Sequence, residues 1–166
     1  MNALKLIVCA LLLPGLGVAA ESWQAVDLQQ ALQVESRSAA DQARDAGRKP
    51  AQVIELLAVA PGMTVLDVMA ASGYYTEVLS IAVGPDGTVY AQNPQWMLEF
   101  MKGVVDKALS QRLIDDRLPN VVRVDGDLEQ FGIADNSIDG AISALNFHDV
   151  YNDYGPDAAL TLLQQV

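Results

Sequence analysis

The stretch MTVLDVMAASGYYTEVLS, residues 63–80, decides the fold of this chain. Its apolar and β-branched start, residues 64–68, predicts a short buried strand. Small residues follow at 70–73, and a helical pattern begins at Tyr74. A strand, a small-residue turn and a helix form the first half of a βαβ unit, in which a ligand can approach the backbone near a helix N-terminus. Asp67 closes the strand, so its carboxyl group can orient the turn or accept a hydrogen bond from a ligand.

The remaining pattern alternates helices and strands in the way that α/β folds do. Residues 21–46 are polar and favour one or two surface helices. Further helices are expected at 50–58, with Val53, Ile54, Leu56 and Leu57 on the apolar face, at 74–83, at 96–114 and at 158–166. Further strands are expected at 88–91, 121–124 and 141–145. The Trp, Met and Phe residues of 96–114 recur at helical spacing, which is typical of a core-facing stripe.

The second predicted strand ends near Asn93, which lies 26 residues after Asp67. In nucleoside-binding α/β folds an acid at this place holds the two ribose hydroxyls. The amide of Asn93 can accept from one hydroxyl and donate to another, although it carries no charge. Asn93 could equally be a simple turn residue before Pro94, and the sequence leaves both interpretations open.

The run from Arg44 to Asn93 resembles a known family. Its segments RKPAQVIELL, PGMTVLDV, SGYYTEVLS and GTVYAQN are similar to a bacterial family of predicted methyltransferases that carry export signals, and its turn resembles motif I of class I S-adenosylmethionine-dependent methyltransferases. The resemblance covers roughly residues 41–151. It implies a Rossmann-like, doubly wound, mostly parallel sheet, of which this chain would hold the first four strands of about seven, as in a C-terminally truncated chain.

The resemblance also implies a cofactor, S-adenosylmethionine, and a set of residues that bind it. These cofactor-binding residues would be Asp67, Ala71, Gly73, Tyr74, Asn93 and Asp127. Asp127 would accept a hydrogen bond from the adenine amino group, although it could also cap a short helix. The family's first two turn glycines are Met69 and Ala71 here, so the turn should approach the cofactor less closely.

A second group of polar residues follows the fourth predicted strand. Asn146, His148 and Asp149 would lie beyond a strand end, where ligands bind in doubly wound sheets, and they are the candidate catalytic residues. His148, the only histidine, could act as a base or orient the acceptor, or it could be an ordinary loop histidine. Two adjacent residues cannot complete a metal site, so no metal is expected.

Composition limits the partners and the compartment. The 166 residues include 10 Lys and Arg against 21 Asp and Glu, and the net charge of −11 argues against non-specific nucleic-acid or anionic-membrane binding. Residues 1–20 resemble a secretory signal peptide that ends before Glu21, so export to the periplasm is expected, with no stable membrane span after cleavage. The alternative is an N-terminal anchor. The only cysteine, Cys9, lies in this segment.

These observations predict an exported methyltransferase that uses S-adenosylmethionine on a small-molecule acceptor. Residues 21–46 would be a helical lead-in and 47–166 the methyltransferase-like domain. A non-catalytic nucleoside-binding or structural protein on the same fold is the alternative. A nicotinamide dehydrogenase is disfavoured because G-x-G-x-x-G is absent. The mixed-charge patch at 41–49 is interpreted as a solvated helix face, although a place beside the cofactor pocket is also considered.

Overall fold

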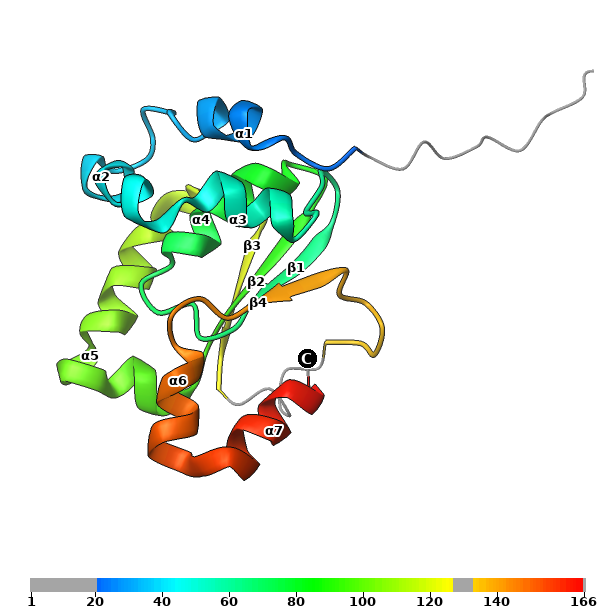
Figure 1. Ribbon diagram of the computed structural model, residues 1–166. Helices are drawn as coiled ribbons and strands as arrows, with labels where there is room; N and C mark the ends of the chain where they lie inside the picture. The colour runs from blue at the N-terminus through cyan, green and yellow to red at the C-terminus, as the bar shows by residue number, and fades with distance from the viewer. Residues whose placement is uncertain (1–20, 127–132, 166) are drawn as a thin grey trace, which may run out of the picture.

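The computed structural model describes residues 21–126 and 133–165. They form a parallel four-stranded sheet with helices on both faces (Figure 1). The strands are β1 (Thr64–Asp67), β2 (Thr88–Asn93), β3 (Val121–Asp125) and β4 (Gly140–Ile142). The helices are α1 (Ala25–Ala31), α2 (Ala39–Arg48), α3 (Pro50–Leu56), α4 (Tyr74–Val83), α5 (Gln95–Arg112), α6 (Phe147–Asp149) and α7 (Gly155–Gln165), with single turns η1 (Ile114–Asp116) and η3 (Val150–Tyr154). The predicted doubly wound α/β architecture is confirmed.

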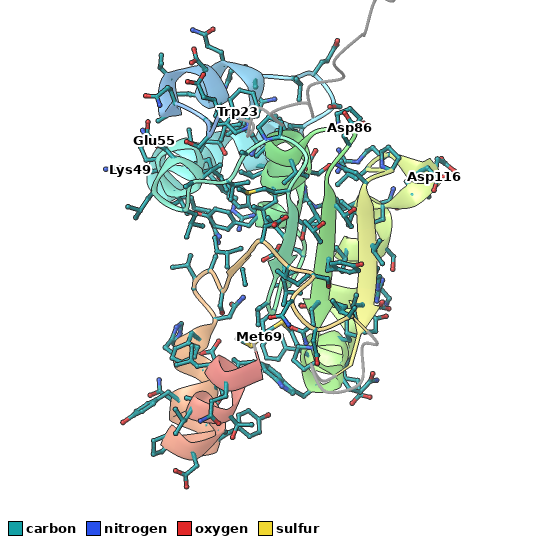
Figure 2. All side chains as sticks on the ribbon, turned by 90° about the vertical axis from the view of Figure 1, so that its right-hand side faces the viewer. Trp23, Lys49, Glu55, Met69, Asp86 and Asp116 are labelled. Atoms are coloured by element: carbon teal, nitrogen blue, oxygen red, sulfur yellow. The ribbon has the colours of Figure 1, made fainter. Side chains whose placement is uncertain are left out.

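The strands lie in the order β3-β2-β1-β4, and every pair is parallel. The chain adds strands outward from β1 to β3 and then crosses back to place β4 on the other side of β1, so the switch point lies between β1 and β4. In open α/β sheets such a switch point leaves a crevice beyond the carboxyl ends of the strands. Figure 2 shows Met69 at that end of the sheet, beside the last helices, and Asp86 at the opposite end.

Alternate residues of β1 supply two separate cores. Val65 packs with Val89 of β2 under α1, α3 and α4, whereas Leu66 faces Met97 of α5. The first core is much the larger, because α4 is buried along almost its whole length. Trp23 adds to this side by donating its indole N–H to the Ala82 carbonyl at 2.7 Å.

Two predicted apolar faces are only partly buried. In α3, Ile54 is fully buried, but Leu56 points the opposite way and is 86% exposed, since residues two apart on a helix lie on opposite faces. In α5, Met97 is buried, whereas Trp96 is 36% exposed and Phe100 is 56% exposed. The prediction that the Trp, Met and Phe stripe is core was therefore wrong for its aromatic members, because only one side of α5 meets the sheet.

The interpretation of residues 41–49 as a solvated face was wrong for Asp41 and Asp45, whose side chains are 6% and 17% exposed and pair with arginines. Asp41 accepts hydrogen bonds from Arg44 and Arg112. Arg112, at the end of α5, also pairs with Glu77 of α4. Arg112 further donates through Nε to the Ser72 carbonyl at 2.8 Å. This charge network, completed by a bond of 2.6 Å from Arg117 to Glu77, fixes α2, α4, α5 and the turn before α4 against one another.

Within the described ranges, no helix combines the length and the apolarity that crossing a membrane requires. Residues 1–20, where a signal peptide is predicted, lie outside the described part of the chain.

Glu77→Gln should lower the free energy of unfolding by about 3 kcal/mol, because it removes the charge that two arginines share in a buried setting. Glu77 is 1% exposed at its side chain. Asp106→Asn is the matched control, since Asp106 pairs with Arg123 but is 47% exposed, and it should cost less than about 1 kcal/mol. Urea unfolding measures both. Equal small losses would contradict a structural role for the network.

Candidate functional site

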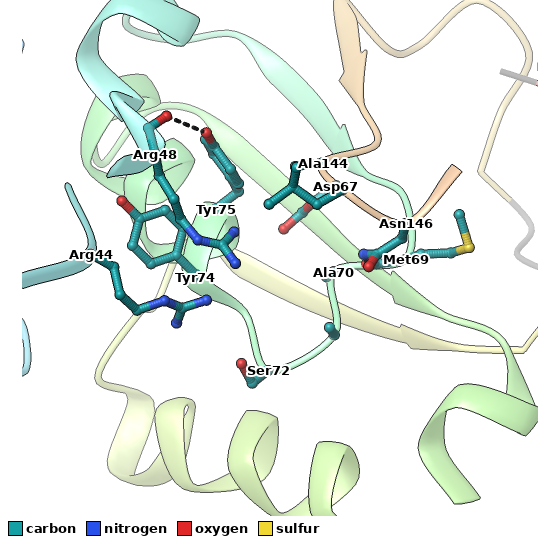
Figure 3. Close-up of a pocket in the computed structure, with 12 residues that line it drawn as sticks. Arg44, Arg48, Asp67, Met69, Ala70, Ser72, Tyr74, Tyr75, Ala144 and Asn146 are labelled. Atoms are coloured by element: carbon teal, nitrogen blue, oxygen red, sulfur yellow. Dashed lines mark hydrogen bonds between the residues drawn. The ribbon is translucent and has the colours of Figure 1, made fainter. Parts of the chain in front are cut away.

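A pocket lies at the switch point, between the turn that follows β1 and the segment that follows β4. Its described lining comes from the end of α2, the turn after β1, the start of α4 and the residues after β4. These lining residues are Arg44, Arg48, Asp67, Met69, Ala70, Ala71, Ser72, Tyr74, Tyr75, Ala144, Leu145 and Asn146. Figure 3 shows Asp67 at the back of this space, with the two arginines and Ser72 around it.

Asp67 is the only carboxyl group among the described residues that line the pocket. Its side chain is 2% exposed and accepts a hydrogen bond of 2.7 Å from the Thr76 hydroxyl in the first turn of α4. Burial raises the pKa of Asp67 to about 7, against the smaller opposing effect of the bonds from Thr76. The pocket can therefore change its charge near neutral pH.

The turn after β1 keeps a glycine-like backbone although two of its glycines are replaced. Met69, Ala71 and Gly73 have φ angles of 53°, 51° and 81°. These are the alternate positions where the resembling family has glycine, and side chains rarely adopt such angles because the left-handed region costs about 1–2 kcal/mol per residue. At Gly73 the absence of a side chain also matters, since a Cβ there would lie 2.9 Å from side-chain atoms of Leu109 and Arg112.

Two neighbouring amides at the end of β2 hold this strained turn in place. Gln92 accepts from the Met69 N–H at 2.9 Å through its side chain and from the Ala70 N–H at 2.8 Å through its carbonyl. Asn93 accepts from the Ala71 N–H at 2.7 Å and donates to the Ala71 carbonyl at 3.1 Å. We call these bonds the amide clasp. They use three successive N–H groups that a ligand could otherwise have bound.

The clasp changes what Asn93 can do. Its side chain is 0% exposed, it does not line the pocket, and both ends of its amide are engaged by Ala71. Its predicted contact with a ribose stays a prediction that requires the clasp to open. Asp127, the predicted adenine contact, lies outside the described residues.

Tyr74 and two arginines form the wall of the pocket nearest α2. The guanidinium carbons of Arg44 and Arg48 lie 4.7 and 4.8 Å from the centre of the Tyr74 ring. The Tyr74 hydroxyl donates to Asp45 at 2.6 Å. Burial, and then the bond to Asp45, raise the pKa of Tyr74, so the ring stays neutral and offers its face to both cations.

The three candidate catalytic residues separate in the structure. Asn146 lines the pocket and donates to the Met69 carbonyl. The His148 side chain is 66% exposed and pairs with Asp149 at 3.0 Å, and neither residue lines the pocket. A catalytic role for His148 and Asp149 stays a prediction. The described residues contain no group of three side chains that could hold a metal ion.

Sequence reasoning missed several residues that build the site. A place beside the cofactor pocket was considered for residues 41–49, but Arg44 and Arg48 were given no binding role of their own, although their spacing of four places them on one helix face. Gln92 was passed over, although it precedes Asn93. Arg112 gives no local signal, because its partner Asp41 is 71 residues away.

Comparison with known proteins identifies the family. A model of the family described as protein-L-isoaspartate(D-aspartate) O-methyltransferase matches residues 26–137, which is more than half of the chain. The chain belongs to this family. No curated protein matches the chain in sequence.

A solved structure supports the same fold. The chain is similar to a SAM-dependent methyltransferase from Aquifex aeolicus, with a TM-score of 0.59 and 25% identity over 87% of this chain and 67% of that one. Shorter overlaps occur with fibrillarin from Aeropyrum pernix crystallised with S-adenosylmethionine (TM-score 0.34, 26% identity, 42% of this chain and 26% of that one). A protein-L-isoaspartate O-methyltransferase overlaps with 48% of this chain and 23% of its own, with a TM-score of 0.38 and 26% identity. The family and the Aquifex structure confirm an S-adenosylmethionine-dependent methyltransferase of the class I fold.

The pocket fits one end of this cofactor. Asp67 receives its hydrogen bonds from Thr76 alone within the described residues, and a carboxylate has room for further donors such as an ammonium group. Three of the residues predicted to bind the cofactor, Asp67, Ala71 and Tyr74, line this pocket together with Asn146, and their contact with S-adenosylmethionine stays a prediction. When bound, S-adenosylmethionine supplies a methyl group on a positively charged sulfur.

The stability of the protein should fall as pH rises from about 5 to about 8, by about 2–3 kcal/mol. The folded chain raises the pKa of Asp67 from 3.8 to about 7, so it binds a proton more tightly than the unfolded chain does. The stabilisation is complete below about pH 4 and is lost as Asp67 ionises near pH 7.

Urea unfolding of the wild type and of Asp67→Asn across this range measures the effect, and Asp67→Asn should remove it. Asp41 and Asp45 do not interfere, because bonds from Arg112 and Arg37 outweigh burial and hold the pKa of each below its usual value. A wild-type slope that persists in Asp67→Asn would contradict the assignment to Asp67.

Ala71→Gly should leave the free energy of unfolding unchanged or raise it by up to about 1 kcal/mol. The release of left-handed strain, about 1–2 kcal/mol, exceeds the entropy that glycine adds to the unfolded chain. Ala70→Gly is the matched control, since the adjacent Ala70 has no positive φ, and it should lower stability by about 1 kcal/mol. Thermal melts compare the two. Equal losses would show that Ala71 carries no strain.

Proposed function

We propose that the chain transfers the methyl group of S-adenosylmethionine to an oxygen of a carboxylate acceptor, with an isoaspartyl residue in a peptide as the first acceptor to test. The make-up of the pocket carries this proposal. Among the described residues that line it there are two arginines, two tyrosines and one buried carboxyl group, but no histidine or lysine. The chain spans 67% of the length of the Aquifex enzyme.

The chemistry of the acceptor follows from its protonation state. A hydroxyl or amine acceptor loses a proton during methyl transfer and benefits from a positioned base. A carboxylate is already ionised at neutral pH, so alignment with the methyl group is the main requirement. His148, the predicted base, is exposed outside the pocket, and the described lining holds no histidine or lysine. The lining therefore suits an acceptor that needs no base.

The family gives independent support for this acceptor. Its description names protein isoaspartate and an O-methyl product. The small-molecule acceptor expected from the sequence remains a second candidate, because a free carboxylic acid presents the same reactive group.

The amide clasp favours a different proposal, a non-catalytic protein on the same fold. Gln92 and Asn93 use the N–H groups of Met69, Ala70 and Ala71, and a ligand has no access to them while the clasp is closed. The transfer assay below distinguishes this alternative from an enzyme.

The chain incubated with S-adenosylmethionine carrying a labelled methyl group should label a peptide that contains one isoaspartyl residue. The label should leave as methanol on mild alkaline treatment, since the product is a carboxylic methyl ester. The same peptide with an ordinary aspartyl residue is the matched acceptor control and should take up at least about tenfold less label, which corresponds to about 1.4 kcal/mol of discrimination.

Each other result has a definite meaning. Alkali-stable label would place the methyl group on a hydroxyl or amine and would contradict the carboxylate acceptor. Equal labelling of both peptides would contradict recognition of isoaspartate. No labelling of any carboxylic acid, peptide or free, with retained binding of S-adenosylhomocysteine would support the non-catalytic alternative.

A further inference from the structure

Arg44 and Arg48 are a pair of like charges at one pocket wall. They are four residues apart in α2, so they lie on the same helix face, and Figure 3 shows both guanidinium groups turned toward the space beside Ser72 and Asp67. Arg44 pairs with Asp41 at 3.0 Å. Arg48 has no carboxylate within salt-bridge distance in the described part of the chain. Like charges four residues apart on a helix destabilise each other, and a bound anion at this wall would offset both charges.

The surroundings hold both cations in place. Both guanidinium groups lie against the Tyr74 ring. The Tyr75 hydroxyl donates to the Arg48 carbonyl at 3.1 Å, which attaches the end of α2 to α4. The arginines further along this network are already satisfied: Arg37 pairs with Asp45, and Arg112 pairs with Asp41 and Glu77. Arg44 and Arg48 are the cations of this group that also line the pocket.

The charge balance and the size of the pocket indicate the ligand group. Asp67 is the only acid in the described lining, and with a pKa near 7 it is substantially protonated at neutral pH. The pocket is therefore positive, although the chain as a whole carries −11. Its volume of about 60 Å³ is enough for a few water-sized groups. A small planar anion that can bind a guanidinium group through two oxygens fits these limits.

We infer that Arg44 and Arg48, held over Tyr74, form a carboxylate-binding site in this pocket. The inference rests on the proposed function for the identity of the two possible sources. The carboxylate belongs either to the amino-acid end of the cofactor or to the methyl acceptor. In both cases the arginines are binding residues that set which ligand enters the pocket and how it is oriented.

Titration calorimetry on the full chain separates the two sources. S-adenosylhomocysteine carries the carboxylate, whereas 5′-methylthioadenosine has the same nucleoside and thioether without the amino-acid end. If the cofactor supplies the carboxylate, Arg48→Gln should weaken S-adenosylhomocysteine binding about 10- to 100-fold and leave methylthioadenosine unchanged. If the acceptor supplies it, both nucleosides should bind normally and the KM for the isoaspartyl peptide should rise by the same factor with kcat retained.

Two further variants keep the test decisive. Lys107→Gln removes the same charge from an exposed position on α5 that does not line the pocket, and it should change neither affinity nor KM. Arg48→Lys keeps the charge but loses the two-pronged geometry, so it should give an intermediate loss, and it answers the question if circular dichroism shows that Arg48→Gln does not fold.

The outcomes also separate this inference from the proposed function. A chain that methylates no carboxylic acid but loses S-adenosylhomocysteine affinity in Arg48→Gln keeps the site and refutes the proposed acceptor. If Arg48→Gln and Arg48→Lys both behave like Lys107→Gln toward the nucleosides and the peptide, the site is overturned. A wild-type chain that binds neither nucleoside nor peptide overturns both.

Discussion

The amide clasp is the interaction on which the pocket depends. Met69 and Ala71 adopt left-handed conformations although neither is glycine, and the bonds from Gln92 and Asn93 are the main contacts that compensate for this strain. Each hydrogen bond contributes about 0.5–1.5 kcal/mol, so the four bonds of the clasp are comparable in size to the strain of about 1–2 kcal/mol at each of the two residues. Hydrogen bonds from neighbouring amides thus stabilise a backbone conformation that glycine would adopt without strain. As a result the turn keeps its shape, but its N–H groups are bonded within the protein.

Buried charged side chains also hold the turn after β1, from the side that faces α5. Arg112 joins the Ser72 carbonyl to Glu77 and Asp41, so the turn after β1 is fastened from its outer side as well as from β2. Asp41 also holds Arg44, and this contact places one of the two pocket arginines. The pocket wall formed by α2 is therefore positioned by electrostatic contacts with α4 and α5 rather than by apolar packing alone.

The local parts of the fold could be predicted from the sequence, and the distant contacts could not. The bounds of α4 agree with the predicted helix, and β1 differs from its prediction only at Val68, because a turn with glycine and a β-branched run are local signals. The partners of Glu77 are 35 and 40 residues away, and periodicity carries no information about such pairs. For the same reason Asn93 was placed at the correct strand end, but the direction of its amide depends on the conformation of a turn 22 residues earlier.

The pH dependence of Asp67 ties the stability of the pocket to its ligand. With a pKa near 7, Asp67 is neutral in the folded chain over a range in which it would be ionised in the unfolded chain. A cation bound beside it favours the ionised form, whereas the two arginines would be offset by a bound carboxylate. A ligand that carries both an ammonium group and a carboxylate can pair with Asp67 and with the two arginines at once. A ligand that carries only a carboxylate leaves Asp67 protonated. The pH at which a ligand binds most tightly therefore depends on which of these charges it brings into the pocket.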